Sequence, residues 1–283
     1  MLQQYFLKPI DYLIIGHIAK DITPEGKQIG GTATYAALTA RALGLRAGIV
    51  TSWAVDAPSD ELSDIPIINF PSEVSTTFEN IITPEGRIQY IYDIAPSLGF
   101  NLIPDTWRNT PIVHLGPIAQ EVDSTLIRNF PSSFIGISPQ GWLRNWDEQG
   151  RVTSCEWPEA SFVLQGAGAV VMSMEDVDNQ ESRIEEMAAF CHILVVTEGK
   201  EGSRVYWNGD VRRFSAPKVQ EIDSTGAGDI YAAAFFTRLH VTRDPWEAAR
   251  FATTLASYSV TRCGLDGIPT DEEIKECMIE VFE

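Results

Sequence analysis

Short apolar segments alternate with helical patterns through most of this chain, and this alternation restricts its fold more than any other feature. Buried strands are predicted over residues 12–15, 47–53, 112–115, 134–137, 169–172 and 193–196. Helical patterns lie between several of them, including 32–43 and 181–190, and a further one follows the last strand at 245–260. Continuous apolar strands joined by helices predict an α/β fold of three layers, with a mostly parallel central sheet covered on both faces.

Two short segments interrupt this rhythm with nearly the same sequence. Thr-Pro-Glu-Gly occupies 23–26 and again 83–86, with Pro and Gly where a tight turn needs them. We expect two hairpins, with lid segments at about 20–30 and 73–95, that form a small β sheet over the strand ends. The alternative is a pair of ordinary surface hairpins. Residues 1–283 are otherwise expected to form one domain.

Charge and cysteine content exclude several classes of protein. The formal net charge is −18, which argues against nucleic acid and anionic membranes as partners. The four cysteines form no Cys-x-x-Cys pair and the four histidines are scattered, so reduced thiols are expected and a zinc site is not. No apolar run approaches the ~20 residues of a membrane span, and the N-terminus shows no secretory signal. These features predict a cytoplasmic protein.

One glycine loop carries the strongest functional signal. Residues 223–229 read Asp-Ser-Thr-Gly-Ala-Gly-Asp, and an apolar helical stretch follows them. Gly226, Ala227 and Gly228 let the backbone turn so that amide groups and the positive end of the helix face one point, which favours an anion such as phosphate. Asp229 at the edge of this loop could take a proton from an attacking hydroxyl. The alternative is a glycine loop in which an Asp merely caps a helix.

The loop resembles the C-terminal signature of the ribokinase-like (PfkB) carbohydrate kinases, and the resemblance extends from Gly16 to about Gly267. It implies a ribokinase-like fold and transfer of the γ-phosphate of ATP to a hydroxyl group. In that reading Asp229 is the base, and the amides of Gly226, Ala227 and Gly228 stabilise the charge on the transferring phosphoryl group.

The same resemblance assigns an acceptor site. Asp21, shortly after the first strand, matches the acid that binds substrate hydroxyls, and Gly30 and Gly31 match the glycine pair before the next helix. Tyr35 stands where the family usually has Asn, so the identity of the sugar does not carry over. Its flat ring favours a cyclic acceptor and the charge of Asp21 a neutral one, with inositol-like rings slightly preferred over nucleosides.

Two further segments of the resemblance follow predicted strands. Gln140 and Arg144 fall where some members have an Asp-Pro-Asn…Arg element, and Arg144 could clamp a phosphate or substrate oxygen; a surface Arg is nearly as good a reading. Residues 173–176, Ser-Met-Glu-Asp, fall where the family has Asn-x-x-Glu, which helps hold magnesium: Ser173 replaces the Asn, Asp176 replaces the Glu, and Glu175 could substitute for Asp176. A helix cap formed by Ser173 explains these acids equally well.

The nucleotide side of the site is implied by two matches. The family's Thr-x-Gly-x-x-Gly element corresponds to Thr197, Gly199 and Gly202, and its last segment, which borders the base and sometimes a monovalent cation, includes Ser257. Thr225 in the glycine loop completes the predicted nucleotide contacts. The implied cofactors are ATP and Mg²⁺.

The sequence therefore predicts an ATP-dependent kinase for a small neutral sugar, cyclitol or nucleoside. Its partners are the acceptor and the nucleotide, and it is a monomer or a homodimer formed through the lid. The alternative is a non-catalytic sugar- or nucleotide-binding protein with a kinase fold, which the departures at Tyr35, Ser173 and Asp176 favour. A dinucleotide-binding oxidoreductase is disfavoured because no Gly-x-Gly-x-x-Gly turn follows the first strand.

Overall fold

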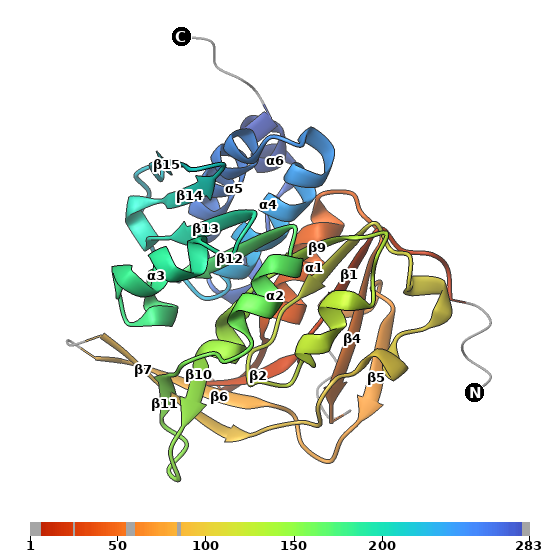
Figure 1. The fold of residues 1–283 in the computed structure, drawn as a ribbon. Coiled ribbons are helices and arrows are strands. Elements are labelled where there is room, and N and C mark those ends of the chain that lie inside the picture. Colours follow the sequence, from red (N-terminus) through yellow and green to blue (C-terminus); the bar gives the residue numbers. More distant parts are fainter. Residues whose placement is uncertain (1–6, 25, 55–59, 84–85, 279–283) are drawn as a thin grey trace.

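The structure, a computed structural model, describes residues 7–24, 26–54, 60–83 and 86–278. Within these residues the main sheet has nine strands in the order β15-β14-β13-β12-β9-β8-β1-β4-β5 (Figure 1). In chain order they are β1 (Tyr12–Ile15), β4 (Ala47–Trp53), β5 (Ile67–Pro71), β8 (Ile112–Leu115), β9 (Phe134–Ile137), β12 (Ala169–Ser173), β13 (Ile193–Thr197), β14 (Ser203–Trp207) and β15 (Asp210–Phe214).

The pairing is parallel from β5 to β13, and β14 and β15 continue the sheet as an antiparallel hairpin. All four residues of β1 are buried: Tyr12 and Ile14 pack into one core cluster, and Leu13 and Ile15 into another. Because both faces of the sheet are covered, every residue of β1 is buried, and this accounts for its continuous apolar sequence.

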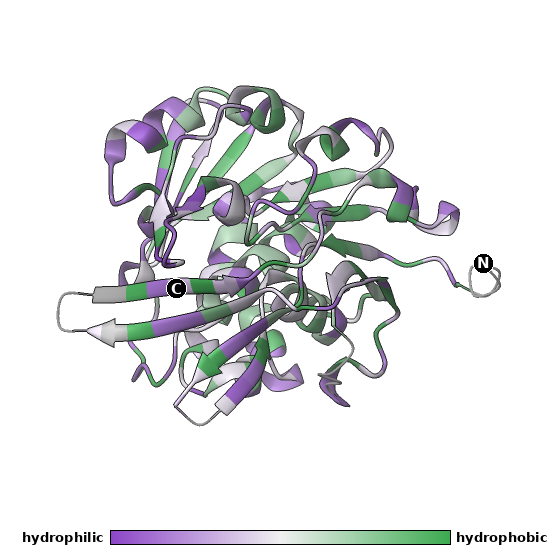
Figure 2. Ribbon diagram, turned by 90° about the horizontal axis from the view of Figure 1, so that it is seen from below, coloured by the Kyte–Doolittle hydropathy of each residue, from purple (hydrophilic) through white to green (hydrophobic). Residues whose placement is uncertain are grey.

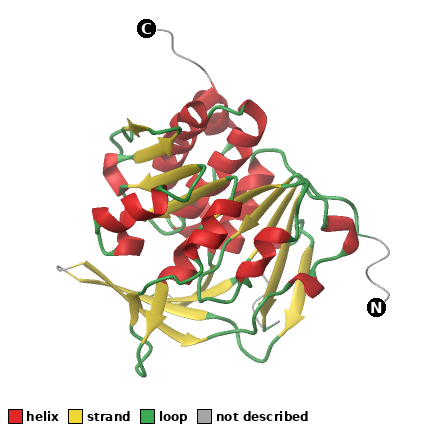
Figure 3. Cartoon of the chain, viewed as in Figure 1, coloured by secondary structure: helices red, strands yellow, loops and turns green. Residues whose placement is uncertain are grey.

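Helices cover each face, and Figure 3 shows them on the two sides of the yellow sheet. The helices are α1 (Thr32–Ala42), α2 (Ala160–Gly166), α3 (Glu181–Ala188), α4 (Ala227–Thr242), α5 (Pro245–Ser259) and α6 (Asp271–Met278). α1, α4, α5 and α6 contribute to the core cluster that contains Tyr12, and α2 and α3 to the one that contains Leu13. The predicted three-layer α/β fold is confirmed.

The two predicted hairpins form a separate sheet, here called the lid sheet. Its order is β3-β2-β6-β7, from β2 (Ala19–Thr23), β3 (Gly26–Gly30), β6 (Thr77–Thr83) and β7 (Gly86–Asp93). Figure 2, seen from below, shows green and purple mixed along these strands. Their buried residues Ala19, Phe78 and Ile91 pack on Ile118 and Ala119, so the lid sheet rests on a small core of its own.

Several elements were not predicted. These are β5, the β14–β15 hairpin, α2, α6, and a two-stranded ribbon of β10 (Arg144–Trp146) and β11 (Val152–Ser154) beside β7. The strands β10, β11 and β15 are partly or mostly exposed and contain polar or charged residues, so they lack the apolar run that marks a buried strand. Of the two repeated turns, Glu25, Pro84 and Glu85 lie outside the described residues. Among described residues no helix is both long and apolar enough to cross a membrane.

Candidate active site

The order of the strands locates the candidate site. β1 lies between β4 and β8, so the chain leaves the first strand toward one edge of the sheet and later returns to build the other. The loops after β1 and β8 separate at this point, and in open α/β sheets ligands bind there, outside the carboxyl ends of the strands. The two loops start in close contact: a Cβ on Gly16 would lie 2.3 Å from the carbonyl oxygen of Gly116.

The glycine loop leads directly into α4. Gly226 is the N-cap residue, with φ of 77°, a conformation that favours glycine. Asp223 holds the loop, because its carboxylate accepts from the amides of Thr225 at 2.9 Å and Gly264 at 2.8 Å. The amide of Ala227 donates to Ser224, whereas the helix start leaves its first-turn amides without intrahelical acceptors. A Cβ on Gly228 would meet nothing within 4 Å, so this turn borders open space.

Asp229 lies in the first turn of α4, and a buried hydroxyl orients it. Thr32, at the start of α1, donates to Oδ1 of Asp229 at 2.7 Å. Burial raises the pKa of Asp229 to about 6; the hydrogen bond from Thr32 and the charge of Arg144 oppose this rise, and Asp176 adds to it. An ionised carboxylate with such a pKa is a competent proton acceptor near neutral pH.

Asp21 belongs to the same electrostatic cluster. Burial and the nearby charge of Asp229 raise its pKa to about 6, and Arg144 partly opposes the shift. The structure therefore brings together three predicted residues from distant parts of the chain: Asp21 on β2, Arg144 at the start of β10 and Asp229 on α4.

These pKa values predict a pH dependence. Because both pKa values lie above the ordinary 3.8, the two carboxyl groups gain protons as the pH falls through about 6. The protonated Asp229 cannot act as a base, so kcat/KM should fall below that pH, by about tenfold per pH unit for one essential carboxylate. Steady-state rates from pH 5 to 8 (about the range in which such groups titrate) would test this, and a profile flat a full unit below the pKa would contradict it.

Gly30 and Gly31 lie where the chain passes close to its neighbours, just before α1 begins. Gly30 pairs with Ala19 between β3 and β2, and a Cβ on Gly30 would lie 1.9 Å from Oδ2 of Asp21. Gly31 is the N-cap residue of α1, and its φ of 84° favours glycine. Gly30 thus lets the chain pass close to Asp21, and Gly31 lets it pass close to the backbone of His17, whose carbonyl oxygen would lie 2.8 Å from a Cβ.

Tyr35 lies beneath the glycine loop. It is almost fully buried, and a Cβ on Gly226 would lie 2.4 Å from the tyrosine ring. Burial and the charges of Asp21, Asp229 and Asp223 raise the pKa of its hydroxyl well above the ordinary value. The side chain therefore lies among the acids of the site while its ring supports the loop.

Gln140 and Arg144 follow β9, in and after a short 3₁₀ helix (Pro139–Leu143). Gln140 is half-buried there. Nη1 of Arg144 donates to the carbonyl of Ile118 at 3.2 Å, and its guanidinium lies 5.5 Å from the ring of Phe78 in the lid sheet. Arg144 thus links the loop after β8 to the lid sheet, and its charge acts on both carboxylates.

The segment after β12 forms a capping box. Ser173 accepts from the amide of Glu175 at 3.2 Å, and Asp176 accepts from the amide of Ser173 at 2.8 Å. Asp176 also raises the pKa of Asp229, which places its charge beside the base. No cluster of three metal-binding side chains occurs in the described part of the chain. Magnesium commonly needs only one or two carboxylates in addition to water and substrate phosphates, so these acids fit it.

The predicted nucleotide residues lie at two places. Thr197 ends β13, and Gly199 and Gly202 follow it in a 3₁₀ turn with φ of 56° and 102°. Thr225 is exposed in the glycine loop. Ser257 on α5 is buried, and its hydroxyl donates to the carbonyl of Thr253 at 2.7 Å.

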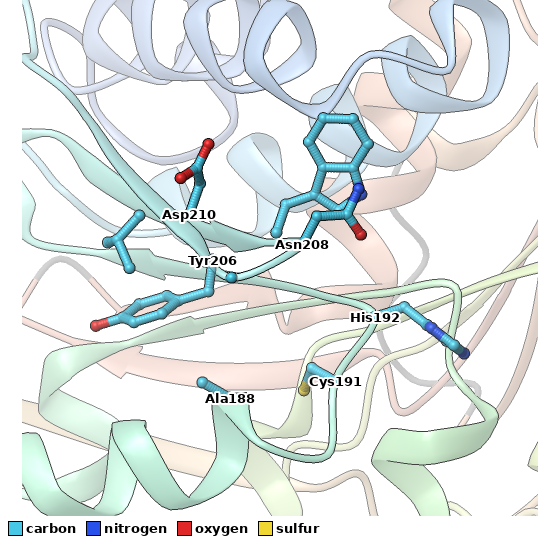
Figure 4. Close-up of a pocket in the computed structure, with 9 residues that line it drawn as sticks. Ala188, Cys191, His192, Tyr206, Asn208 and Asp210 are labelled. Carbon is cyan, nitrogen blue, oxygen red and sulfur yellow. The ribbon is translucent and has the colours of Figure 1, made fainter.

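Two residues were missed by the sequence analysis. Thr32 orients Asp229, and its place directly after the glycine pair was a usable signal. Glu121 accepts amides from the loops after β1 and β8, and no motif marks it. A cavity of about 180 Å³ beside Cys191 and Trp207 (Figure 4) includes none of the predicted site residues. It is smaller than the ~300 Å³ that small-molecule sites usually reach.

Comparison with known proteins finds similarity in sequence to carbohydrate kinases. Residues 156–271 match the pfkB family carbohydrate kinase. A ribokinase of Bacillus subtilis is 37% identical over 95 residues, covering 33% of this chain and 32% of that protein. An inositol 3-kinase of Oryza sativa is 30% identical over 91 residues, 32% of this chain and 22% of that protein. The chain thus spans about a third or less of the length of these relatives.

Solved structures match over nearly the whole fold. A pyrophosphate-dependent myo-inositol kinase superposes with a TM-score of 0.78 at 17% identity, covering 94% of this chain and 97% of that one. An Arabidopsis thaliana ribokinase complexed with ribose and ATP gives 0.74 at 16% identity, with 97% and 100% covered. Residues 156–271 are therefore similar in sequence to the pfkB family carbohydrate kinases, and the fold of the chain is similar to that of kinases in the ribokinase family.

Proposed function

We propose that this protein is an ATP-dependent kinase that transfers the γ-phosphate to a hydroxyl group of a small neutral sugar, cyclitol or nucleoside. One observation carries the proposal: Asp229, held by Thr32, lies in the first turn of α4, beside amides that have no intrahelical acceptor, and shares an electrostatic cluster with Asp21 and Arg144. A base, an anion site and a hydroxyl-binding acid thereby converge at the carboxyl ends of the strands. The relatives named as kinases support the same reaction class.

Each residue then has a defined part in the reaction. Asp21 accepts hydrogen bonds from acceptor hydroxyls, and Asp229 takes the proton from the hydroxyl that attacks the γ-phosphorus. The P–O bond to ADP breaks as the new P–O bond forms, and the amides at Gly226, Ala227 and Gly228, together with Arg144, stabilise the charge of the transferring group. Closure of the lid sheet excludes water, which would otherwise be phosphorylated.

The nucleotide is proposed to lie between the two glycine turns. Thr197, Gly199 and Gly202 border one side, and Thr225 and Ser257 the other. Gly30, Gly31, Tyr35 and Gln140 are proposed to complete the acceptor side. Residues 1–283 would act as one cytoplasmic domain, monomeric or paired through the lid sheet, and a monovalent cation near the last segment is part of the same proposal.

Magnesium is the proposed metal, and Glu175 and Asp176 would hold its water shell. When bound, it neutralises charge on the donor phosphates. We expect Asp176→Ala to raise the magnesium concentration needed for half-maximal rate, and Glu175→Ala to do so less, because Glu175 is exposed. Initial rates across a magnesium titration would measure both shifts. If neither variant changes the titration, the segment is only a helix cap.

The acceptor class can be tested directly with a panel of inositols, sugars, nucleosides, sugar acids and sugar phosphates, with ATP and pyrophosphate as alternative donors. Asp21 disfavours anionic acceptors because like charges would meet at a partly desolvated site. We expect the highest kcat/KM for a neutral ring with ATP. A higher kcat/KM for a sugar acid or sugar phosphate than for every neutral ring would refute the proposed acceptor class. Phosphorylation of an acceptor by pyrophosphate but not by ATP would refute ATP as the donor.

Tyr35 variants separate two roles of that side chain. If the phenol contacts the acceptor, Tyr35→Phe and Tyr35→Asn should change the ranking of acceptors. If the ring only supports Gly226, the ranking should stay the same and the rate should fall with Tyr35→Asn alone.

The rival function, a non-catalytic binding protein, predicts saturable binding of a sugar or nucleotide without turnover of any acceptor on the panel.

A further inference from the structure

A buried carboxylate lies between two loops of the candidate site. Glu121 is 2% exposed. Its Oε1 accepts from the backbone amides of His17 at 3.0 Å and Ile118 at 3.1 Å, and its Oε2 from Ile118 at 2.9 Å and Ala119 at 2.7 Å. Three amides directed at one carboxylate compensate for the loss of water around its charge.

The amides come from loops on different strands. His17 lies between β1 and β2, whereas Ile118 and Ala119 follow β8. β1 and β8 are neighbours in the sheet, and their two loops diverge at this point. Glu121 therefore ties together the loops that form the base of the candidate site.

Each tied loop leads to a residue of the proposed reaction. Asp21 follows His17 by four residues on β2, and the carbonyl of Ile118 accepts the hydrogen bond from Arg144. Arg144 in turn lowers the pKa of Asp21. A shift of one loop against the other would change the distance between the acid that binds the acceptor and the cation beside it.

The ring of His17 extends the connection to the lid sheet. Its Nε2 contacts the carbonyl of Pro96 at 3.0 Å, which can only accept, so Nε2 carries the proton. In the neutral imidazole, Nδ1 then accepts from the hydroxyl of Thr76 at 2.7 Å, and that hydroxyl accepts from the amide of Ala95 at 3.0 Å. Thr76 directly precedes β6 and Pro96 follows β7, so both ends of the lid hairpin are fastened to one imidazole.

We propose that Glu121 and His17 form the hinge of the lid sheet and that Glu121 is a positioning residue, which sets Asp21 and the lid sheet relative to Arg144. This proposal rests on the proposed kinase function for its kinetic consequences only. Glutamine at position 121 would keep the size of the side chain, but its NH₂ group would face backbone N–H donors that need an acceptor. The hinge would then lose hydrogen bonds without losing volume.

The test uses the full chain with matched variants. Glu121→Gln removes acceptors from the hinge, Thr76→Val removes its hydroxyl, and Thr76→Ser restores that hydroxyl. Glu247→Gln is the control for lost stability, because Glu247 on α5 is a little-exposed carboxylate that pairs with Arg238. Arg238 lies on α4, more than two helical turns from Asp229, so the pair is remote from the candidate site. Amide hydrogen exchange of the unliganded protein and steady-state kinetics with the best acceptor are measured for all four.

We expect Glu121→Gln and Thr76→Val to lower kcat/KM for the acceptor by roughly 10- to 100-fold, chiefly through KM. The amides of Ala95, Ile118 and Ala119 should exchange faster in at least one of the two. Thr76→Ser should be close to wild type, and Glu247→Gln should keep the acceptor KM whatever its Tm.

The outcomes separate the hinge from the reaction. If these amides exchange faster in Glu121→Gln or Thr76→Val but the protein phosphorylates no acceptor, the proposed hinge stands and the proposed kinase function is refuted. If these amides exchange at the wild-type rate in both Glu121→Gln and Thr76→Val, the proposed hinge is overturned. It is also overturned if the enzyme is active and both variants keep the wild-type KM for the acceptor. A KM that rises as much in Glu247→Gln would also overturn it, because the effect would then be one of general stability.

Discussion

Replacing Asp229 by Asn should lower kcat by about 10²- to 10⁴-fold, the usual contribution of a general base, while binding of the donor persists. The substitution keeps an oxygen that can accept from Thr32, so the side chain stays in place and only the proton acceptor is lost. The folded-state pKa of about 6 exceeds the ordinary 3.8, so ionisation of Asp229 destabilises the fold at neutral pH. Asn carries no charge, and Tm should therefore rise while activity falls.

Single-turnover rates, donor affinity and thermal unfolding would measure these three effects. Asp244→Asn is the matched control: it also removes a carboxylate at the start of a helix, where Asp244 caps α5 through the amides of Trp246 and Glu247. Asn is an equally good cap, so this control should retain full activity. Turnover of the Asp229 variant within a few-fold of wild type would show that another group takes the proton.

The second large effect is expected at Gly226. Alanine there would place a Cβ 2.4 Å from the ring of Tyr35, at a backbone φ of 77°. The loop must move to relieve this contact, and a displacement of about 1 Å in a catalytic constellation can cost about 10²-fold in rate. We therefore expect Gly226→Ala to lose about two orders of magnitude in kcat with the fold retained.

Gly209→Ala separates the contact from the backbone strain. Gly209 has a similar φ of 82°, but a Cβ there would meet nothing within 4 Å, and the residue lies in the β14–β15 turn. Both variants should lose about 1–2 kcal/mol of stability from the left-handed conformation. Only Gly226→Ala should lose turnover, and kcat equal in the two variants would contradict the role given to the loop.

Local patterns were enough to predict much of this fold. The buried strands, the helix over α1, the helix that begins at Pro245 and the two hairpins follow from apolar runs, stop signals and turn residues, each of which acts within a few residues. The unpredicted β14–β15 hairpin shows the limit. Its outer strand Asp210–Phe214 is mostly exposed and forms because β14 offers a free sheet edge, not because of its own apolar pattern.

The candidate site divides in the same way. The sequence by itself determined the glycine turns and the acids, because glycine content and charge are local properties. Only the tertiary structure decided which groups meet: that Tyr35 lies against Gly226, that Thr32 holds Asp229, and that Glu121 joins two loops. It also decided the pKa values of Asp21 and Asp229, because desolvation and neighbouring charges depend on what the folded chain packs around a carboxylate.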